Sequence, residues 1–231
     1  MTTVALIGGD GAGKSSIARA LVDSSQGRMR YLYMGMNPGS ANVALPTSKL
    51  VYRAKQKSLE ADGREGASLH SLEHRKRQRG RLWSMARLGN RLAEEIFRQL
   101  LSWTYQLRGA IVVYDRHFLF DFWSTSAKRQ PVLDRIHLWF LRRVYPKPDL
   151  VLFLDAPSAV LYDRKPEVPV SYLDHRRKAF IQAGSQVERF VTIDAARPLS
   201  EVLAEVRHQI VDQLQKKPAR GGTEVMKGGR S

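Results

Sequence analysis

The stretch Gly8-Gly9-Asp10-Gly11-Ala12-Gly13-Lys14-Ser15 fits the pattern G-x-x-x-x-G-K-[ST] of a phosphate-binding loop. A short apolar run, 3–7, precedes it, and a segment with helical spacing, 15–23, follows it, so the loop has the strand-before, helix-after context that the pattern requires. In such a loop the backbone N–H groups point at the phosphates, the lysine reaches the terminal phosphates and the hydroxyl binds magnesium. The sequence therefore predicts a site for ATP and Mg²⁺ formed by Gly8, Gly9, Asp10, Gly11, Ala12, Gly13, Lys14, Ser15 and Ser16.

The rest of the chain alternates buried-strand candidates with helical patterns. Four more short apolar runs are expected as strands, at 30–34, 110–114, 150–154 and 190–193. Helical spacing is found at 82–107, 132–144, 159–163, 171–183 and 200–215. This alternation predicts an α/β fold of three layers, with a five-stranded parallel sheet flanked by helices.

Composition narrows the classes of function. The 231 residues contain no cysteine, which excludes disulfides, thiol catalysis and cysteine-bound metal, and the chain is expected in the cytoplasm. No stretch reaches the roughly 18–20 apolar residues of a membrane span. The net charge of +16 is accounted for first by a solvated basic helix and a flexible tail. A charge of this sign also attracts anions, so an anionic substrate or peripheral association with an anionic membrane fits it as well. No nucleic-acid-binding motif is present, so nucleic acid is not an expected partner.

The expected organisation is one P-loop domain over 1–215, which contains a basic insert and is followed by a basic tail. Residues 53–78 are weakly apolar and rich in Arg, Lys and Glu, and they are predicted as a mobile, partly helical insert. Residues 216–231, with four glycines and a proline, are predicted as a flexible basic tail.

Asp10 is unexpected inside a loop that binds anions. One physical role is to accept a hydrogen bond from an acceptor hydroxyl beside the γ-phosphate, and the alternative is a carboxylate that only faces solvent. The loop resembles the form G-x-D-G-x-G-K-[ST] of thymidylate kinases, P-loop nucleoside monophosphate kinases in which this Asp contacts the sugar hydroxyl of the acceptor nucleotide.

A second motif, Asp115-Arg116-His117, follows the strand expected at 110–114 and is similar to the Asp-Arg-Tyr or Asp-Arg-His of the same family. An acidic residue at the carboxyl end of a core strand holds a magnesium-bound water or orients the nucleophile. Arg116 can neutralise phosphoryl oxygens through its bidentate fork. We therefore expect Ser15 and Asp115 at the metal, Arg116 at the phosphates, and His117 in a structural role.

A third match, P-D-L-V-L-F-L-D-A-P at 148–157, resembles the strand that leads to the family's lid. The resemblance implies a lid region at 157–177, whose arginines close over the triphosphate. Arg164 is the lid residue that we expect to act, while Arg176 and Arg177 are also compatible with solvated surface charge. The expected catalytic set is Lys14, Asp10, Asp115, Arg116 and Arg164.

The acceptor side departs from the family's pattern. After the second strand the family has an Arg-Glu-Pro-Gly-Gly-Thr-like segment, whereas this chain has 34–42, M-G-M-N-P-G-S-A-N, without the charged pair. Arg87 lies on the helix where the family places an acceptor-phosphate arginine. Asp121, in the bulky apolar run 118–123, is either an acceptor-side group or a helix cap. The expected acceptor-binding residues are Asp10, Arg87, Arg116 and Asp121.

Three functions remain open at this point. The first is an ATP- and Mg²⁺-dependent kinase that acts on a nucleoside monophosphate such as dTMP. The second is a kinase of the same type that phosphorylates a sugar or glycan intermediate, favoured by the altered acceptor segment. The third is a nucleotide-dependent binding module without transfer, which the retention of Lys14, Ser15, Asp115 and Arg116 disfavours. Because relatives on this fold are often dimers, a homodimer is also an open expectation.

Overall fold

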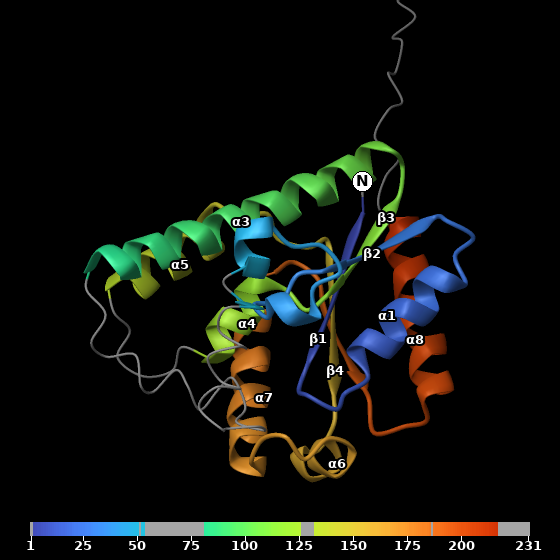
Figure 1. Cartoon of the computed structure of the whole chain (residues 1–231). Coiled ribbons are helices and arrows are strands. Elements are labelled where there is room, and N and C mark those ends of the chain that lie inside the picture. The colour runs from blue at the N-terminus through green and yellow to red at the C-terminus, as the bar shows by residue number, and fades with distance from the viewer. Residues whose placement is uncertain (1, 51, 54–80, 126–131, 186, 217–231) are drawn as a thin grey trace, which may run out of the picture.

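Five parallel strands form the central sheet in the order β2-β3-β1-β4-β5. This is a computed structural model, and it describes residues 2–50, 52–53, 81–125, 132–185 and 187–216 (Figure 1). The strands are β1 (Thr3–Gly8), β2 (Met29–Tyr33), β3 (Ile111–Asp115), β4 (Leu150–Asp155) and β5 (Phe190–Asp194). The expected α/β fold with a five-stranded parallel sheet is therefore confirmed.

Helices cover both faces of the sheet, which makes three layers (Figure 1). The described helices include α1 (Lys14–Asp23), η1 (Pro38–Ser40), α3 (Arg81–Leu107), α4 (Phe118–Thr125), α5 (Val132–Arg143), α6 (Ser158–Arg164), α7 (Val170–Gly184) and α8 (Leu199–Lys216). Helices α1 and α8 pack on one face, with Ile17, Leu21 and Val206 in its core. The other face buries Phe120, Leu141 and Phe180, from α4, α5 and α7.

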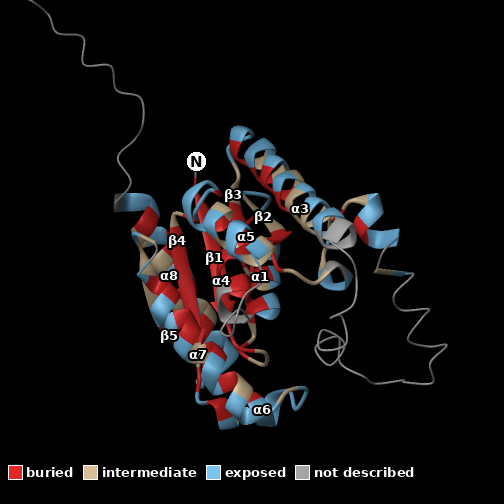
Figure 2. Ribbon diagram, turned by 90° about the vertical axis from the view of Figure 1, so that its left-hand side faces the viewer, coloured by how far each residue is buried: buried red, intermediate tan, exposed pale blue. Residues whose placement is uncertain are grey.

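The central strands β1, β3 and β4 are buried on both faces (Figure 2). They consist almost wholly of apolar residues, as is typical of a parallel sheet covered on both sides. Strand β1 pairs with β3 through Leu6 and Asp115, and with β4 through Gly8 and Leu154. Because parallel strands end at the same edge, this register brings the loop after β1 and the end of β3 together. The site lies at that edge, as expected for an open α/β sheet.

Helix α4 is one of the elements that the sequence pattern did not predict. Its buried residues Phe118, Leu119, Phe120 and Phe122 are almost consecutive, so the segment shows no helical period. A helix that is apolar on nearly all sides is one that is enclosed by others, and α4 packs against both α5 and α7.

The predictions for the insert fall on residues that are almost all outside the described ranges, as do those for 217–231. The predicted lid region, 157–177, contains α6 and the first half of α7. Within the described ranges, no helix combines the length and the apolar character that a bilayer crossing requires.

Candidate active site

The loop between β1 and α1 is held close to α6. Gly11 has φ +89°, and a Cβ atom at this position would lie 2.6 Å from the carbonyl oxygen of Leu161. Gly13, the N-cap of α1, has φ +81°. Glycine is the residue that adopts such angles without strain, so the G-x-G spacing lets the backbone wrap a ligand at the start of α1.

Lys14 turns its side chain back into this loop. Its Nζ donates a hydrogen bond to the carbonyl oxygen of Gly9 at 2.6 Å, and the residue is buried. Burial, together with the nearby positive charge of Arg116, lowers the pKa of Lys14 to about 7. Burial makes the charged form of Lys14 unfavourable in the free protein. A bound anion stabilises this charged form, because the negative charge replaces the solvation that burial removes.

Asp115 ends β3 opposite the start of α1 and has the features of a cation ligand. Its Oδ2 accepts hydrogen bonds from Ser15 Oγ at 2.6 Å and from the hydroxyl of Tyr31 at 2.8 Å. Its Oδ1 is buried and has no hydrogen-bond partner among the described residues. A carboxylate and a hydroxyl are oxygen ligands that Mg²⁺ accepts, and the unpartnered Oδ1 fits a further contact to the ion or its water.

Two arginines and two aspartates form a ring beside this pair. Arg116 Nη2 donates to Asp10 Oδ1 at 2.5 Å, and its Nη1 lies 3.8 Å from Asp121 Oδ1. Arg176 closes the ring, because it donates to Asp10 Oδ2 and to Asp121 Oδ1, each at 3.3 Å. The ring joins the phosphate loop, the end of β3, α4 and α7, and it is called the Asp–Arg ring below.

The ring fixes the charge state of its members. Although burial opposes its ionisation, the charges of Arg116, Lys14 and Arg176 hold the pKa of Asp10 well below its usual range. Arg116 also has φ +69°, a left-handed conformation that non-glycine residues rarely adopt. Strain of this kind persists where the surroundings enforce it, and it is concentrated at functional sites.

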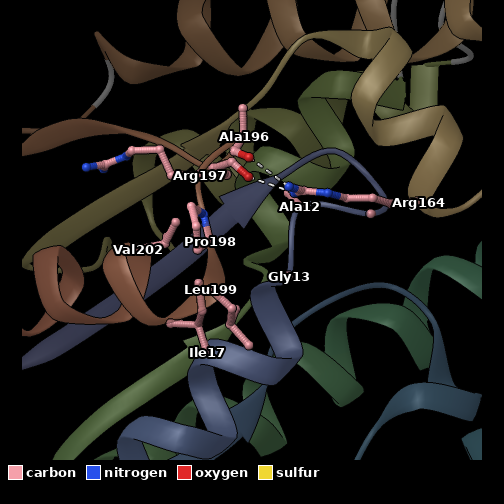
Figure 3. Close-up of a pocket in the computed structure, with 11 residues that line it drawn as sticks. Ala12, Gly13, Ile17, Arg164, Ala196, Arg197, Pro198, Leu199 and Val202 are labelled. Carbon is pink, nitrogen blue, oxygen red and sulfur yellow. Dashed lines mark hydrogen bonds between the residues drawn. The ribbon is translucent and has the colours of Figure 1, made fainter.

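A cavity adjoins the phosphate loop (Figure 3). This cavity of about 510 Å³ is lined by Gly11–Gly13 of the loop, by Ile17 of α1 and by the 195–199 segment between β5 and α8. Arg164, at the end of α6, donates to the carbonyl oxygens of Ala195 at 2.7 Å and Ala196 at 3.0 Å. The volume of the cavity falls within the range of small-molecule sites, and the cavity opens beside the phosphate loop.

The neighbouring arginines of α7 have different roles. Arg176 is buried, and its guanidinium also lies 5.1 Å from the ring centre of Phe180. Arg177 instead forms a two-pronged hydrogen bond with Asp155, with both contacts at 2.6 Å. Arg177 therefore holds α7 to the end of β4, whereas Arg176 reaches the Asp–Arg ring.

The segment that follows β2 is held in place by side chains of α3. Arg98 is fully buried and donates to the carbonyl oxygens of Tyr33 at 3.1 Å and Gly35 at 2.9 Å, and it pairs with Glu94. Glu94 in turn accepts a hydrogen bond from the backbone of Leu45 at 3.0 Å. These contacts fix the backbone of the segment after β2 to α3.

The structure therefore gathers most, but not all, of the predicted site residues. Asp10, Lys14, Ser15, Asp115, Arg116 and Asp121 lie together at the carboxyl edge of the sheet. Arg164 lies at the separate cavity rather than in the Asp–Arg ring, and Arg87 lies on the exposed surface of α3. His117 is buried, accepts a hydrogen bond from the backbone of Leu119 and has its pKa lowered by burial to about 3, which fits a structural role.

Arg176, Tyr31 and Arg98 are the residues that the sequence did not single out. Arg176 had a usable signal, since it shares the buried stripe of α7 with Leu173, Phe180 and Ala183. An arginine within a buried stripe needs a partner, and here the partners are carboxylates. Tyr31 and Arg98 act through contacts between distant segments, for which the sequence offers no spacing rule.

Comparison with known proteins also relates the chain to nucleotide kinases. No protein-family model matches the chain. A thymidylate kinase of Clavibacter michiganensis subsp. michiganensis is 26% identical, over 88% of this chain and 92% of that protein. One from Wigglesworthia glossinidia brevipalpis is 27% identical, over 47% of this chain and 60% of its own length.

Among solved structures, a deoxyadenosine kinase from M. mycoides, with dCMP and a flexible dCDP bound, has a TM-score of 0.53 and 14% identity. That likeness covers 91% of this chain and 100% of the other, and at this identity it shows the fold. Taken with the phosphate loop and the motifs around Asp115, these comparisons show that the chain is similar in sequence to thymidylate kinases and shares the fold of a nucleoside kinase, and they support a phosphotransferase.

Proposed function

We propose that this protein transfers the γ-phosphoryl group of ATP, in the presence of Mg²⁺, to a small acceptor, most readily a nucleoside monophosphate such as dTMP. The observation that carries the proposal is the buried ammonium of Lys14 beside the Ser15–Asp115 pair, in which Asp115 Oδ1 has no hydrogen-bond partner within the described part of the chain. A buried cation and an unsatisfied carboxylate oxygen side by side are costly in a resting protein, and both are relieved by a phosphate with its metal ion.

In this proposal the residues divide the work by position. Ser15 and Asp115 would hold Mg²⁺, which supplies charge neutralisation of the phosphate oxygens when bound. Lys14 and Arg116 would place positive charge around the transferring group, where transition-state charge develops. Asp10 would orient the acceptor by accepting a hydrogen bond from its hydroxyl where that hydroxyl faces the loop.

The cavity lined by Arg164 is the proposed place of the adenine. It adjoins the loop at Gly11–Gly13, and its other walls, Ile17, Leu199 and Val202, are apolar. A base between apolar walls and a guanidinium plane is a favourable arrangement, since arginine stacks on aromatic faces. Arg164 would then act on the nucleotide from the base side, and its reach to the phosphates stays a prediction.

A second candidate, a sugar or glycan hydroxyl as acceptor, is favoured by the Asp–Arg ring. Arg116 and Arg176 both face Asp10 and Asp121, so the two positive charges are already balanced by two carboxylates. An acceptor phosphate would have to compete with these carboxylates, whereas a neutral hydroxyl would not. The competition weakens phosphate recognition without excluding it.

The deciding experiment supplies ATP and Mg²⁺ with separate acceptors and measures ADP release. The panel contains dTMP, the other nucleoside monophosphates, the matching nucleosides and a set of free sugars. Fast release with dTMP supports the first candidate, and release only with sugars supports the second. ADP release no faster than ATP hydrolysis without acceptor, across the whole panel, would overturn both.

A further inference from the structure

The cavity beside the phosphate loop is lined by a guanidinium that is already engaged. Arg164 directs Nη1 to the carbonyl oxygen of Ala195 at 2.7 Å and Nη2 to that of Ala196 at 3.0 Å (Figure 3). Both alanines line the cavity together with Arg164 itself. The two hydrogen bonds hold the guanidinium against the segment between β5 and α8, and they occupy two carbonyl oxygens that a ligand in the cavity would otherwise meet.

Other carbonyl oxygens of the same segment also have donors. That of Asp194 accepts from Arg197 Nε at 3.2 Å. That of Pro198 accepts from the start of α8, from the backbone of Glu201 at 3.1 Å and of Val202 at 3.2 Å. A carbonyl oxygen beside a guanidinium is also a poor acceptor for a further N–H group, because the positive charge repels the incoming hydrogen. The segment therefore offers little acceptor capacity to a bound base.

The remaining walls of the cavity are largely apolar. Ile17 of α1 and Leu199 and Val202 of α8 line it. Leu199 extends towards the phosphate loop, since a Cβ atom at Gly13 would lie 3.6 Å from its Cδ1. Apolar side chains and a guanidinium plane contact the faces of an aromatic ring. Contacts with these faces do not depend on which groups the ring carries at its edge.

Adenine and guanine differ at that edge. Adenine carries a 6-amino group, which needs an acceptor, whereas guanine carries a 6-oxo group, which needs a donor, and both have the acceptor N7. A site built to hydrogen-bond a substrate N–H group rejects the analogue that lacks it by about 10⁴-fold or more. A site that contacts only apolar surface discriminates far less.

We propose that this cavity binds the purine of a nucleoside triphosphate without selecting adenine over guanine, and that Arg164 is the residue responsible. The inference rests on the proposed function, in which the cavity holds the base of the phosphoryl donor. A guanidinium has five N–H groups and no acceptor, so it cannot receive the 6-amino group of adenine. Beyond the bonds to Ala195 and Ala196 it retains N–H groups that can donate to N7 of either base or to O6 of guanine. GTP is then a phosphoryl donor alongside ATP.

The first test measures binding without an acceptor, by titration calorimetry of the wild type. The probes are the Mg²⁺ complexes of ATP, GTP and purine riboside triphosphate, which has no substituent at position 6, so the phosphates are the same in all three. We expect the three dissociation constants to agree within about tenfold. A preference for ATP larger than that, over either of the others, would overturn the inference and leave the proposed function in place. Failure of all three to bind would overturn the proposed function itself.

The second test assigns the breadth of binding to Arg164. The variant Arg164→Met removes the guanidinium and leaves the carbonyl oxygens of Ala195 and Ala196 to the base. Both nucleotides should bind more weakly, but the ratio of GTP to ATP dissociation constants should rise at least about fivefold, because only adenine gains acceptors for its amino group. The matched control is Arg207→Met on α8, which removes an exposed guanidinium that donates to Ser24 Oγ at 2.9 Å, and it should leave the ratio unchanged. An Arg164→Met protein that is folded by circular dichroism and binds both nucleotides more weakly by the same factor would show that Arg164 does not set the choice of base.

Discussion

Arg116 Nη2 lies 2.5 Å from Asp10 Oδ1, so the arginine that follows β3 is paired with the carboxylate inside the phosphate loop. Asp10 also accepts a hydrogen bond from Arg176 on α7, and both arginines face Asp121 on α4. The residues next to the phosphate loop are therefore connected to α4 and α7, which border the proposed acceptor side. Binding of an acceptor must exchange some of these contacts for new ones.

Replacement of Asp10 by alanine should impair acceptor use far more than nucleotide binding. The loop loses a negative charge, which favours phosphates, but Arg116 and Arg176 lose the carboxylate that orients them. We expect KM for the acceptor to rise at least about tenfold, the effect of roughly 1.4 kcal/mol, while the affinity for Mg·ATP stays equal or improves. ADP-release kinetics and titration calorimetry measure the two quantities.

The control for that variant is Asp23→Ala, which removes an exposed carboxylate at the end of α1. It should leave both quantities unchanged. Acceptor kinetics that are the same in Asp10→Ala and the wild type would contradict the assignment.

Mg·ATP binding should take up a proton above neutral pH, through Lys14. In the free protein burial lowers the pKa of Lys14 to about 7, so at pH 8 this side chain is mostly neutral. Phosphate at the loop favours the ammonium and raises that pKa, so binding at pH 8 takes up nearly one proton and binding at pH 6 takes up none. Calorimetry in two buffers of different ionisation enthalpy counts the protons.

The variant Lys14→Met should lose this proton uptake and reduce turnover by several orders of magnitude. Its stability should also depend less on pH. A lysine with a folded pKa near 7 and an unfolded value near 10.5 binds more protons in the unfolded state between these limits, so the wild type gains stability as pH rises through that window. An equal slope of stability against pH in both proteins would contradict the lowered pKa.

The sequence predicted those parts of the site that are formed by consecutive residues. The loop Gly8–Ser15 and the strand end at Asp115 each combine a motif with an apolar run, and the structure places them as expected. The Asp–Arg ring was harder to predict from the sequence. One of its members, Asp121, lies in α4, and because nearly every residue of this helix is apolar, the segment shows no helical period. Arg176 and Arg177 are adjacent, and the helical spacing from Leu173 and Phe180 places Arg176 rather than Arg177 on the buried side of α7.

The buried pair Glu94–Arg98 should stabilise the fold chiefly because neither residue is tolerable alone. Arg98 is 1% exposed, so Arg98→Met leaves the carboxylate of Glu94 uncompensated beside the segment after β2. We expect the free energy of unfolding to fall by about 3–5 kcal/mol, as for other broken buried pairs. Urea unfolding followed by circular dichroism provides the value.

The double variant Glu94→Leu/Arg98→Met tests that explanation. It removes both charges, so it should be less destabilised than the sum of the two single variants. Additive losses would mean that the pair itself contributes nothing beyond its separate contacts to Tyr33, Gly35 and Leu45.

Tyr31 should act on the metal requirement although it lies outside the proposed metal ligands. Its hydroxyl donates to Asp115 Oδ2 at 2.8 Å, and burial and the charge of Asp115 hold the pKa of Tyr31 above its usual range, so it remains a donor at neutral pH. With Ser15 bound to the same oxygen, the carboxylate is fixed with Oδ1 turned away from these donors.

The variant Tyr31→Phe frees the carboxylate to rotate, and we expect the Mg²⁺ concentration for half-maximal ADP release to rise about tenfold, as for other residues that orient metal ligands. Turnover at saturating Mg²⁺ should change much less, and Tyr162→Phe, which removes a hydroxyl on the more exposed α6, should change neither. A Tyr31→Phe enzyme with an unaltered Mg²⁺ requirement but lowered turnover would mean that Tyr31 supports the sheet edge rather than the proposed metal site.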